Sequence, residues 1–178
     1  MEPIKVSINN ILYTTDLSEN ARYAFAYAVS LANSYKARLI LLHVLSDVPD
    51  IINKNIISGY IGEAQWESIK ENNLQEAKDA LIGKRRDHAL ISGILGEFSA
   101  KAKADLGEHA IPSDEVIVKR GNPVEVILET ANENHCDLIV MGTHGRGTLT
   151  DAMMGSTARR VVRRSKKPVL VVRLPEDV

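Results

Sequence analysis

The sequence contains one especially informative segment, Arg38-Leu-Ile-Leu-Leu-His-Val44, which is a nearly continuous apolar run. A strand with one face in water alternates apolar and polar residues, whereas a strand buried on both faces does not. Strands of the second kind belong to parallel sheets that are covered by helices. This segment therefore predicts a buried strand of a parallel sheet.

Four more segments have the length and apolar character of strands, and helical signals lie between them. The strand candidates are residues 9–14, 116–119, 137–141 and 168–173. Apolar residues at three- and four-residue spacing predict a helix over about 18–36, beginning at Ser18. Asn122 followed by Pro123 predicts the start of a second helix, and a last helix is expected over about 155–165. This alternation indicates an α/β fold, with a doubly wound, mainly parallel five-stranded sheet and helices on both faces.

The stretch between the second and third predicted strands is irregular. Residues 45–113 are far longer than one crossover helix requires. We expect residues 1–178 to form a single domain that carries a mobile insertion at about 45–65 and an extended helical region at about 64–109.

The extended helical region contains two features that the structure can test. Glycines predict an interruption near Gly83 or at Gly93–Gly96. The apolar cluster at residues 89–95 is either part of the core or a partner surface, and we favour the core.

The composition fits one soluble intracellular domain. The 178 residues are 44% hydrophobic, and 22 basic and 23 acidic side chains give a formal net charge of -1. That balance offers no global electrostatic reason to bind nucleic acid or an anionic membrane. The single cysteine, Cys136, excludes an intrachain disulfide and a cysteine-rich zinc module. No apolar run approaches the roughly 20 residues of a membrane span, and no signal peptide is evident, so we expect a cytoplasmic location.

Four of the eleven glycines, at positions 142, 145, 147 and 155, fall within fourteen residues. They form a loop that leaves the fourth predicted strand and enters the last helix. Ligands of open parallel sheets bind at this end of the strands, and glycines let the backbone approach a ligand closely. Gly155-Ser156-Thr157 would present N–H groups and two hydroxyls at a helix start, where the dipole favours a phosphate. The plainer alternative is a glycine-rich turn in which Ser156 or Thr157 only caps the helix.

Two familiar phosphate-binding motifs are absent from the sequence. It contains no Gly-x-x-x-x-Gly-Lys-Ser/Thr segment, which excludes a P-loop. The first predicted strand does not lead into Gly-x-Gly-x-x-Gly, so the dinucleotide fingerprint is also missing.

The spacing Gly142-x2-Gly145-x9-Gly155-Ser156 resembles the nucleotide-binding signature of the universal stress protein family. Further segments similar to family positions are Ile11-Leu-Tyr-Thr-Thr-Asp-Leu-Ser-Glu19, Gly121-Asn-Pro123, Asp137-Leu-Ile-Val-Met-Gly-Thr-His-Gly145 and Lys167-Pro-Val-Leu-Val-Val172. The resemblance covers about residues 1–44 and 114–174 and is weak across 45–113. Because the chain retains the glycine signature, the resemblance is to the subclass of the family that binds ATP.

The resemblance implies an adenine nucleotide alpha hydrolase-like fold, a five-stranded parallel sheet in the order 3-2-1-4-5. That order reverses between strands 1 and 4, which would bring Asp16 and Gly142 to one crevice. The implied ligand is ATP, or ADP or AMP, with Mg or Mn bridging the phosphates and no metal ligand assigned to the protein. The residues expected to contact the nucleotide are Thr14, Thr15, Asp16, Val44, Met141, Gly142, His144, Gly145, Arg146, Gly155, Ser156 and Thr157.

Three of these residues also have other interpretations. His144 could act as a base or metal ligand, but we favour a loop residue that acts through its backbone N–H. Arg146 could pair with a phosphate or simply be exposed. Asp16 could cap the first helix, although we favour contact with the ligand. We assign no catalytic residue.

The charge pattern and the last strand bear on partners. The strongest basic cluster consists of Arg159, Arg160, Arg163, Arg164, Lys166 and Lys167. We interpret it as the solvated face of a short helix whose Val161 and Val162 point inward, rather than as a nucleic-acid site. The last strand would lie at a sheet edge, and pairing with a second copy would cover it. The resemblance to the family implies such a pairing, so we expect a homodimer through about residues 168–174.

These observations together predict an ATP-binding universal stress protein that regulates a stress response. Two alternatives stay open: a slow ATPase in the same crevice, and a protein-interaction module in which the nucleotide is incidental. The glycine loop holds no lysine and Asp16 has no obvious partner in the sequence, so we do not expect an efficient enzyme.

Overall fold

The structure, a computed structural model, describes residues 6–45, 83–106, 114–144 and 154–173, with short stretches at 61–62, 64–65 and 67–68. The predicted mobile insertion at about 45–65 lies almost wholly outside the described residues.

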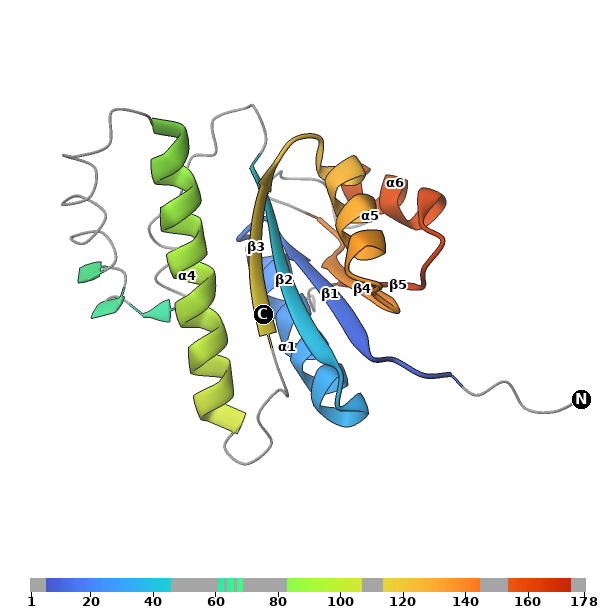
Figure 1. Cartoon of the computed structure of the whole chain (residues 1–178), viewed down its shortest axis with the longest axis horizontal. Helices are drawn as coiled ribbons and strands as arrows, with labels where there is room; N and C mark the ends of the chain where they lie inside the picture. Colours follow the sequence, from blue (N-terminus) through green and yellow to red (C-terminus); the bar gives the residue numbers. More distant parts are fainter. Residues whose placement is uncertain are drawn as a thin grey trace, which may run out of the picture.

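Within the described residues, five parallel strands form one sheet in the order β3-β2-β1-β4-β5 (Figure 1). The strands are β1 (Asn10–Thr15), β2 (Arg38–Leu45), β3 (Asp114–Arg120), β4 (Leu138–Gly142) and β5 (Val169–Val172). Ile11 of β1 lies opposite Leu39 of β2 on one side and opposite Leu138 of β4 on the other. The sheet and its strand order confirm the predicted fold, and each strand lies within two residues of its expected bounds.

Helices cover both faces of the sheet (Figure 1). The first face packs against α1 (Glu19–Tyr35) and α4 (Gly83–Leu106), and the second against α5 (Pro123–Glu133) and α6 (Ser156–Arg164). Three of these helices lie where local signals predicted them. The two faces carry separate clusters of buried side chains, as expected for a doubly wound sheet.

Local signals explain where α1 begins and ends. The Ser18 hydroxyl accepts a hydrogen bond from the Ala21 N–H at 3.2 Å, so Ser18 caps the helix. Lys36 ends it in the left-handed conformation, with φ 56°. The helix packs on the sheet through small buried residues at one face, Ala21, Ala24, Ala28 and Ala32. This close packing holds the turn between β1 and α1 at the carboxyl end of the sheet.

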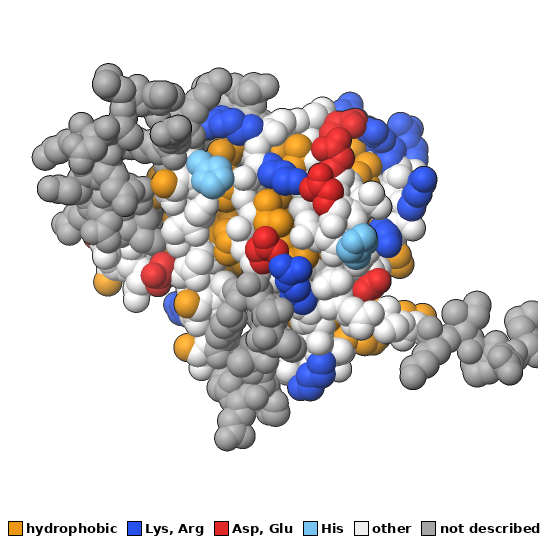
Figure 2. Space-filling model, in the orientation of Figure 1, with side chains coloured by type: hydrophobic (Ala, Val, Ile, Leu, Met, Phe, Trp, Pro, Cys, Tyr) orange, Lys and Arg blue, Asp and Glu red, His pale blue; other side chains and the backbone are white. Residues whose placement is uncertain are grey.

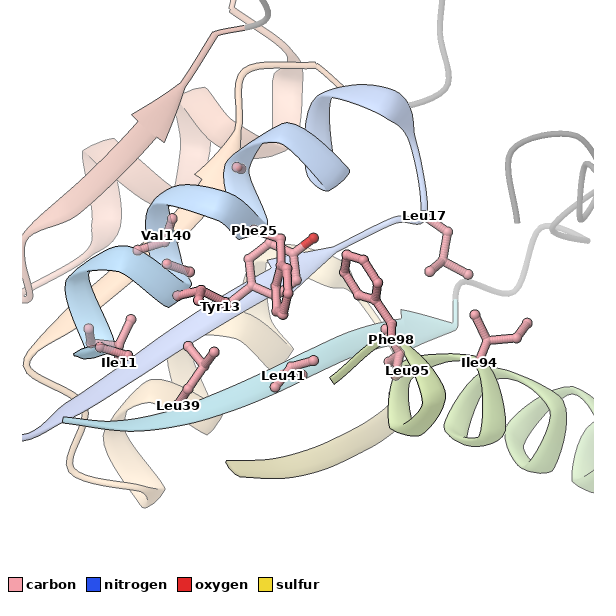
Figure 3. Packing of buried hydrophobic residues seen from close by; sticks show 14 of the residues in the cluster. Ile11, Tyr13, Leu17, Phe25, Leu39, Leu41, Ile94, Leu95, Phe98 and Val140 are labelled. Carbon is pink, nitrogen blue, oxygen red and sulfur yellow. The ribbon is translucent and has the colours of Figure 1, made fainter. Parts of the chain in front are cut away.

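Aromatic side chains form the centre of the first core cluster. Tyr13 of β1, Phe25 of α1 and Phe98 of α4 point toward one another (Figure 3). The ring centroids are 5.0 Å apart for Tyr13 and Phe25, and 4.2 Å apart for Phe25 and Phe98. Ile94 of α4 is fully buried in the same cluster. The apolar residues at 89–95 therefore belong to the core, as we favoured.

The helix α4 is continuous from Gly83 to Leu106. The predicted interruption at Gly93–Gly96 is therefore wrong, and the residues before Gly83, the other expected position, lie outside the described part of the chain. Glycine is a weak helix former, but burial of Ile94 and Phe98 on the same helix outweighs that preference.

The second core cluster joins β1 and β2 to α5 and α6. Leu12 and Ile40 pack there with Ile127 of α5 and Val161 of α6. Val161 is fully buried, but the side chain of Val162 is 45% exposed, so the prediction that both valines point inward is wrong for Val162. Consecutive helical residues lie about 100° apart, which allows only one of the two to face the sheet.

Candidate functional site

A pocket of about 320 Å³ opens at the carboxyl end of the sheet, where the strand order reverses between β1 and β4. Its lining residues are Thr14, Thr15, Asp16, Ala21, Val44, Pro123, Ile127, Met141, Gly142, Thr143, His144, Gly155, Ser156, Thr157 and Ala158. Ten of the twelve predicted site residues are among them. The other two, Gly145 and Arg146, lie outside the described residues.

The turn between β1 and α1 forms one wall of the pocket. Thr15 Oγ1 accepts a hydrogen bond from the Leu17 N–H at 2.9 Å, and Asp16 Oδ1 accepts one from the Ser18 N–H at 3.1 Å. Leu17 adopts a left-handed conformation with φ 62°. These contacts fix the turn and place Asp16 at the pocket. Ser18, not Asp16, caps α1, so the capping interpretation of Asp16 is wrong.

The second wall comes from the end of β2, where Val44 lines the pocket. Its neighbour His43 is buried and donates a hydrogen bond through Nδ1 to the Thr15 carbonyl at 2.8 Å. This bond ties the end of β2 to the end of β1.

The third wall joins the end of β4 to the start of α6. The Gly155 N–H donates to the Thr143 carbonyl at 2.8 Å, and the Thr143 N–H donates to the Val172 carbonyl of β5 at 2.9 Å. A Cβ on Gly155 would lie 2.9 Å from the Thr143 carbonyl oxygen. Glycine is therefore required at this position by the close approach of two backbone segments, in addition to any role toward a ligand.

The start of α6 faces the pocket. Gly155 is the cap residue, and within the described residues no side chain accepts a capping hydrogen bond there. The alternative in which Ser156 or Thr157 caps the helix is therefore wrong: both are helical residues that line the pocket. A helix start has N–H groups without intrahelical partners and carries a partial positive charge.

Sequence reasoning missed five lining residues, Ala21, Pro123, Ile127, Thr143 and Ala158. Pro123 and Ile127 belong to the first two turns of α5, so the N-terminal end of this helix also borders the pocket. The Asn122–Pro123 cap signal had located the helix, but it gave no indication of the pocket. His144 lines the pocket, and its Nδ1 lies 3.1 Å from Thr143 Oγ1.

The described residues contain no group of three or more His, Cys, Asp or Glu side chains that could hold a metal ion. None of their helices combines the length and the apolar character that a membrane crossing requires.

The fold and the pocket define a doubly wound α/β protein with a ligand-sized cavity at the strand-order reversal. The model of the universal stress protein family matches residues 7–173. The chain is 31% identical over 163 residues to a universal stress protein of Thermus aquaticus, which covers 92% of this chain and 97% of that protein. It is 30% identical over 170 residues to universal stress protein MJ0577 of Methanocaldococcus jannaschii, covering 96% and 98%. The chain belongs to the universal stress protein family.

Solved structures share the fold. The structure of MJ0577 is 26% identical with a TM-score of 0.58, covering 96% of this chain and 99% of that one. UspA from Lactobacillus plantarum has a TM-score of 0.61 at 23% identity, covering 95% and 100%. A universal stress protein in complex with cAMP has a TM-score of 0.60 at 24% identity, covering 94% and 98%.

Proposed function

We propose that this chain binds an adenine nucleotide, ATP, in the pocket and acts as an ATP-responsive regulator of a stress response in the cytoplasm. The start of α6 is the observation that carries the proposal. The cap residue, Gly155, has no side chain to accept a hydrogen bond from this helix, and among the described residues Ser156 and Thr157 line the pocket directly. The N–H groups and the positive end of the helix dipole therefore adjoin the cavity, an arrangement that favours a phosphate.

The other walls of the pocket suit a nucleoside. Val44, Pro123 and Ile127 offer apolar contact to a flat base, and Asp16 offers a carboxylate that can accept hydrogen bonds from ribose hydroxyls. A protein of this fold has been solved with cAMP. The proposed nucleotide contacts are Thr14, Thr15, Asp16, Val44, Met141, Gly142, His144, Gly145, Arg146, Gly155, Ser156 and Thr157.

A divalent cation, Mg or Mn, would accompany the phosphates. Asp16 is the one carboxylate among the described lining residues. Mg²⁺ at nucleotide sites keeps several waters and uses one or two carboxylates plus the phosphates. Because Asp16 is proposed to contact the ribose, we assign the cation no ligand among the described residues and expect it to arrive with the phosphates and its own waters.

The described part of the pocket offers little for efficient hydrolysis. The described lining residues include no lysine or arginine. Among these residues, the start of α6 is therefore the main source of positive potential that could stabilise a leaving phosphate. We expect slow turnover at most. Single-turnover hydrolysis faster than about one per minute would favour the ATPase alternative.

The nucleotide site is tested at Ser156, which is exposed and is the first residue of α6. Glu at a helix start interacts favourably with the dipole, so Ser156→Glu should leave stability unchanged or slightly raised. The same carboxylate would repel a triphosphate, and we expect ATP affinity to fall about 100-fold or more by titration calorimetry.

Ser156→Gln is the matched control, because it adds similar bulk without charge and should lose far less affinity. Wild-type protein that gives no heat with ATP, or Glu and Gln variants that bind ATP equally, would overturn the proposal. A full cellular stress response from Ser156→Glu would instead favour the protein-interaction module.

We also propose a homodimer through about residues 168–174. In the described sheet, β5 has β4 as its only neighbour. The Pro168 and Val172 carbonyls accept hydrogen bonds from the N–H groups of Ile139 in β4 and of Thr143, the residue that follows β4. Because backbone groups alternate along a strand, Val171 directs its N–H away from β4, where a second copy can pair.

The substitution Val171→Pro tests the dimer. It removes an outward N–H and leaves the bonds between β5 and β4 in place, since proline is tolerated at a free sheet edge. We expect sedimentation equilibrium to show a dimer for the wild type and for the control Val171→Thr, and a monomer for the proline variant. A dimer that survives the proline would place the interface elsewhere.

A further inference from the structure

Residues 154–173 carry seven basic side chains and no acidic one, whereas the whole chain has 22 basic and 23 acidic side chains. Positive charge is therefore concentrated in one segment of a protein with nearly balanced charge. In Figure 2, Lys and Arg side chains gather at the upper right of the molecule, where Figure 1 places α6. We call the exposed residues Arg159, Arg160, Arg163, Arg164 and Lys166 the α6 basic surface.

The packing of α6 explains why these side chains point outward. Ala158 and Val161 are buried against the sheet, so the basic residues occupy the opposite side of the helix. Arg159 and Arg163 are four residues apart, as are Arg160 and Arg164. Like charges at this spacing lie close together and destabilise a helix. Repulsion between these pairs would be relieved when an anionic group binds.

Only one end of the surface has a carboxylate partner among the described residues. Arg164 of α6 donates a hydrogen bond to Glu125 of α5 at 2.7 Å, and this contact lowers the pKa of the Glu125 carboxyl. Within the described part of the chain, Arg159, Arg160 and Arg163 form no such ion pair. The contact of Arg164 shows that a carboxylate on a neighbouring helix can reach this row of arginines.

We propose that the α6 basic surface binds an acidic polypeptide segment of a partner protein. Arginine dominates the surface, and its planar guanidinium matches the geometry of a carboxylate. Val162 is 45% exposed beside Arg159 and Arg163 and offers apolar contact, which a partner peptide with aliphatic side chains can use.

Other polyanions fit this surface less well. Residues 154–173 contain no aromatic side chain on which a nucleic-acid base could stack. The segment also lacks aromatic side chains that could anchor it in a membrane interface, and its exposed large apolar residues are Met154 and Val162. The test therefore also measures binding of duplex DNA and of anionic vesicles for comparison.

The test measures anisotropy of a fluorescein-labelled peptide of Glu-Glu-Leu repeats with the full chain at low salt. We expect saturable binding that weakens as salt rises. The variant carrying both Arg159→Gln and Arg163→Gln should bind about five- to tenfold more weakly. Its melting temperature should stay equal or rise, because a like-charge contact is lost, and its ATP affinity should not change.

The matched control carries Arg22→Gln and Lys101→Gln, which remove the same charge from exposed positions on α1 and α4. It should bind the peptide like the wild type. No binding of the peptide, equal weakening by the control, or a lower melting temperature of the arginine variant would overturn the proposal. Tighter arginine-dependent binding of duplex DNA or of phosphatidylserine vesicles would overturn it as well.

Discussion

The amino and carboxyl ends of the sheet differ in the partners that their backbone N–H groups have. At the amino end, Asp137 Oδ2 accepts hydrogen bonds from the Asn9 N–H at 2.7 Å and from the Asn10 N–H at 3.1 Å. Nearby Cys136 is buried, and burial, with a smaller effect of the Asp137 charge, raises the pKa of its thiol to about 11. At the carboxyl end, the cap residue of α6 is Gly155, which has no side chain to accept a hydrogen bond, and the helix start adjoins a pocket.

The difference between the two ends separates stability from binding. At the amino end, the Asp137 carboxylate accepts hydrogen bonds from two backbone N–H groups, and its bond to Asn9 joins residues 128 positions apart. The donors at the start of α6 adjoin the cavity and are suited to the phosphate of a ligand. Changes at the amino end should therefore alter folding alone, whereas changes at the carboxyl end can alter ligand affinity alone, as proposed for Ser156.

The largest effect is expected where the carboxyl end is itself structural. Gly155→Ala would place its Cβ 2.9 Å from the Thr143 carbonyl oxygen, and Thr143 is held in turn by its hydrogen bond to the Val172 carbonyl. We expect a loss of about 1–3 kcal/mol in the free energy of unfolding, measured by urea denaturation. ATP affinity should fall as well. Wild-type stability in this variant would show that the contact between the two segments is not tight.

A smaller effect is expected at the amino end. Asp137→Ala removes a charged acceptor of two backbone N–H groups, and we expect a loss of about 1–2 kcal/mol in the same measurement. ATP affinity should stay at the wild-type value because the pocket lies at the other end of β4. Weaker ATP binding in a folded Asp137→Ala protein would contradict the separation between the two ends.

The smallest effect is expected on the pH dependence of the stability that Asp137 contributes. Hydrogen bonds from the Asn9 and Asn10 backbone, with the charge of Lys167, hold the pKa of the Asp137 carboxyl below its ordinary value. The carboxylate therefore contributes its full stability above the unfolded pKa of about 3.9, and the contribution is lost as the pH falls through the lower folded pKa. The stability difference between wild type and Asp137→Ala should be constant from neutral pH to about pH 5 and shrink below about pH 4. A difference that changes near neutral pH would implicate another group.

Most of the fold could be predicted because its signals are local. The apolar run at residues 38–44 and the cap at Asn122 each depend on neighbours within a few residues, and the structure places β2 and α5 at those positions. Where local signals misled, tertiary packing was the cause. Gly93 and Gly96 did not interrupt α4, because burial of Phe98 and other side chains of the helix holds it against the sheet.

The candidate site was only partly predictable, for a related reason. The glycine spacing pointed to Gly155 and Ser156, since those residues belong to one loop and one helix start. Pro123 and Ile127 carried no such signal, because they meet the pocket only when α5 packs beside α6. The contact of Asp137 with the start of β1 was likewise invisible in the sequence.

By itself, the sequence determined the order of the strands, the approximate bounds of the strands and of α1, α5 and α6, the doubly wound class and the loop that leads into α6. These follow from side-chain spacing and capping, which act over a few residues. The tertiary structure alone decided which residues from distant segments share the pocket, which face of α6 is exposed and how the amino end of the sheet is closed. Those features depend on contacts across a packed sheet, and such contacts exist only after the chain has folded.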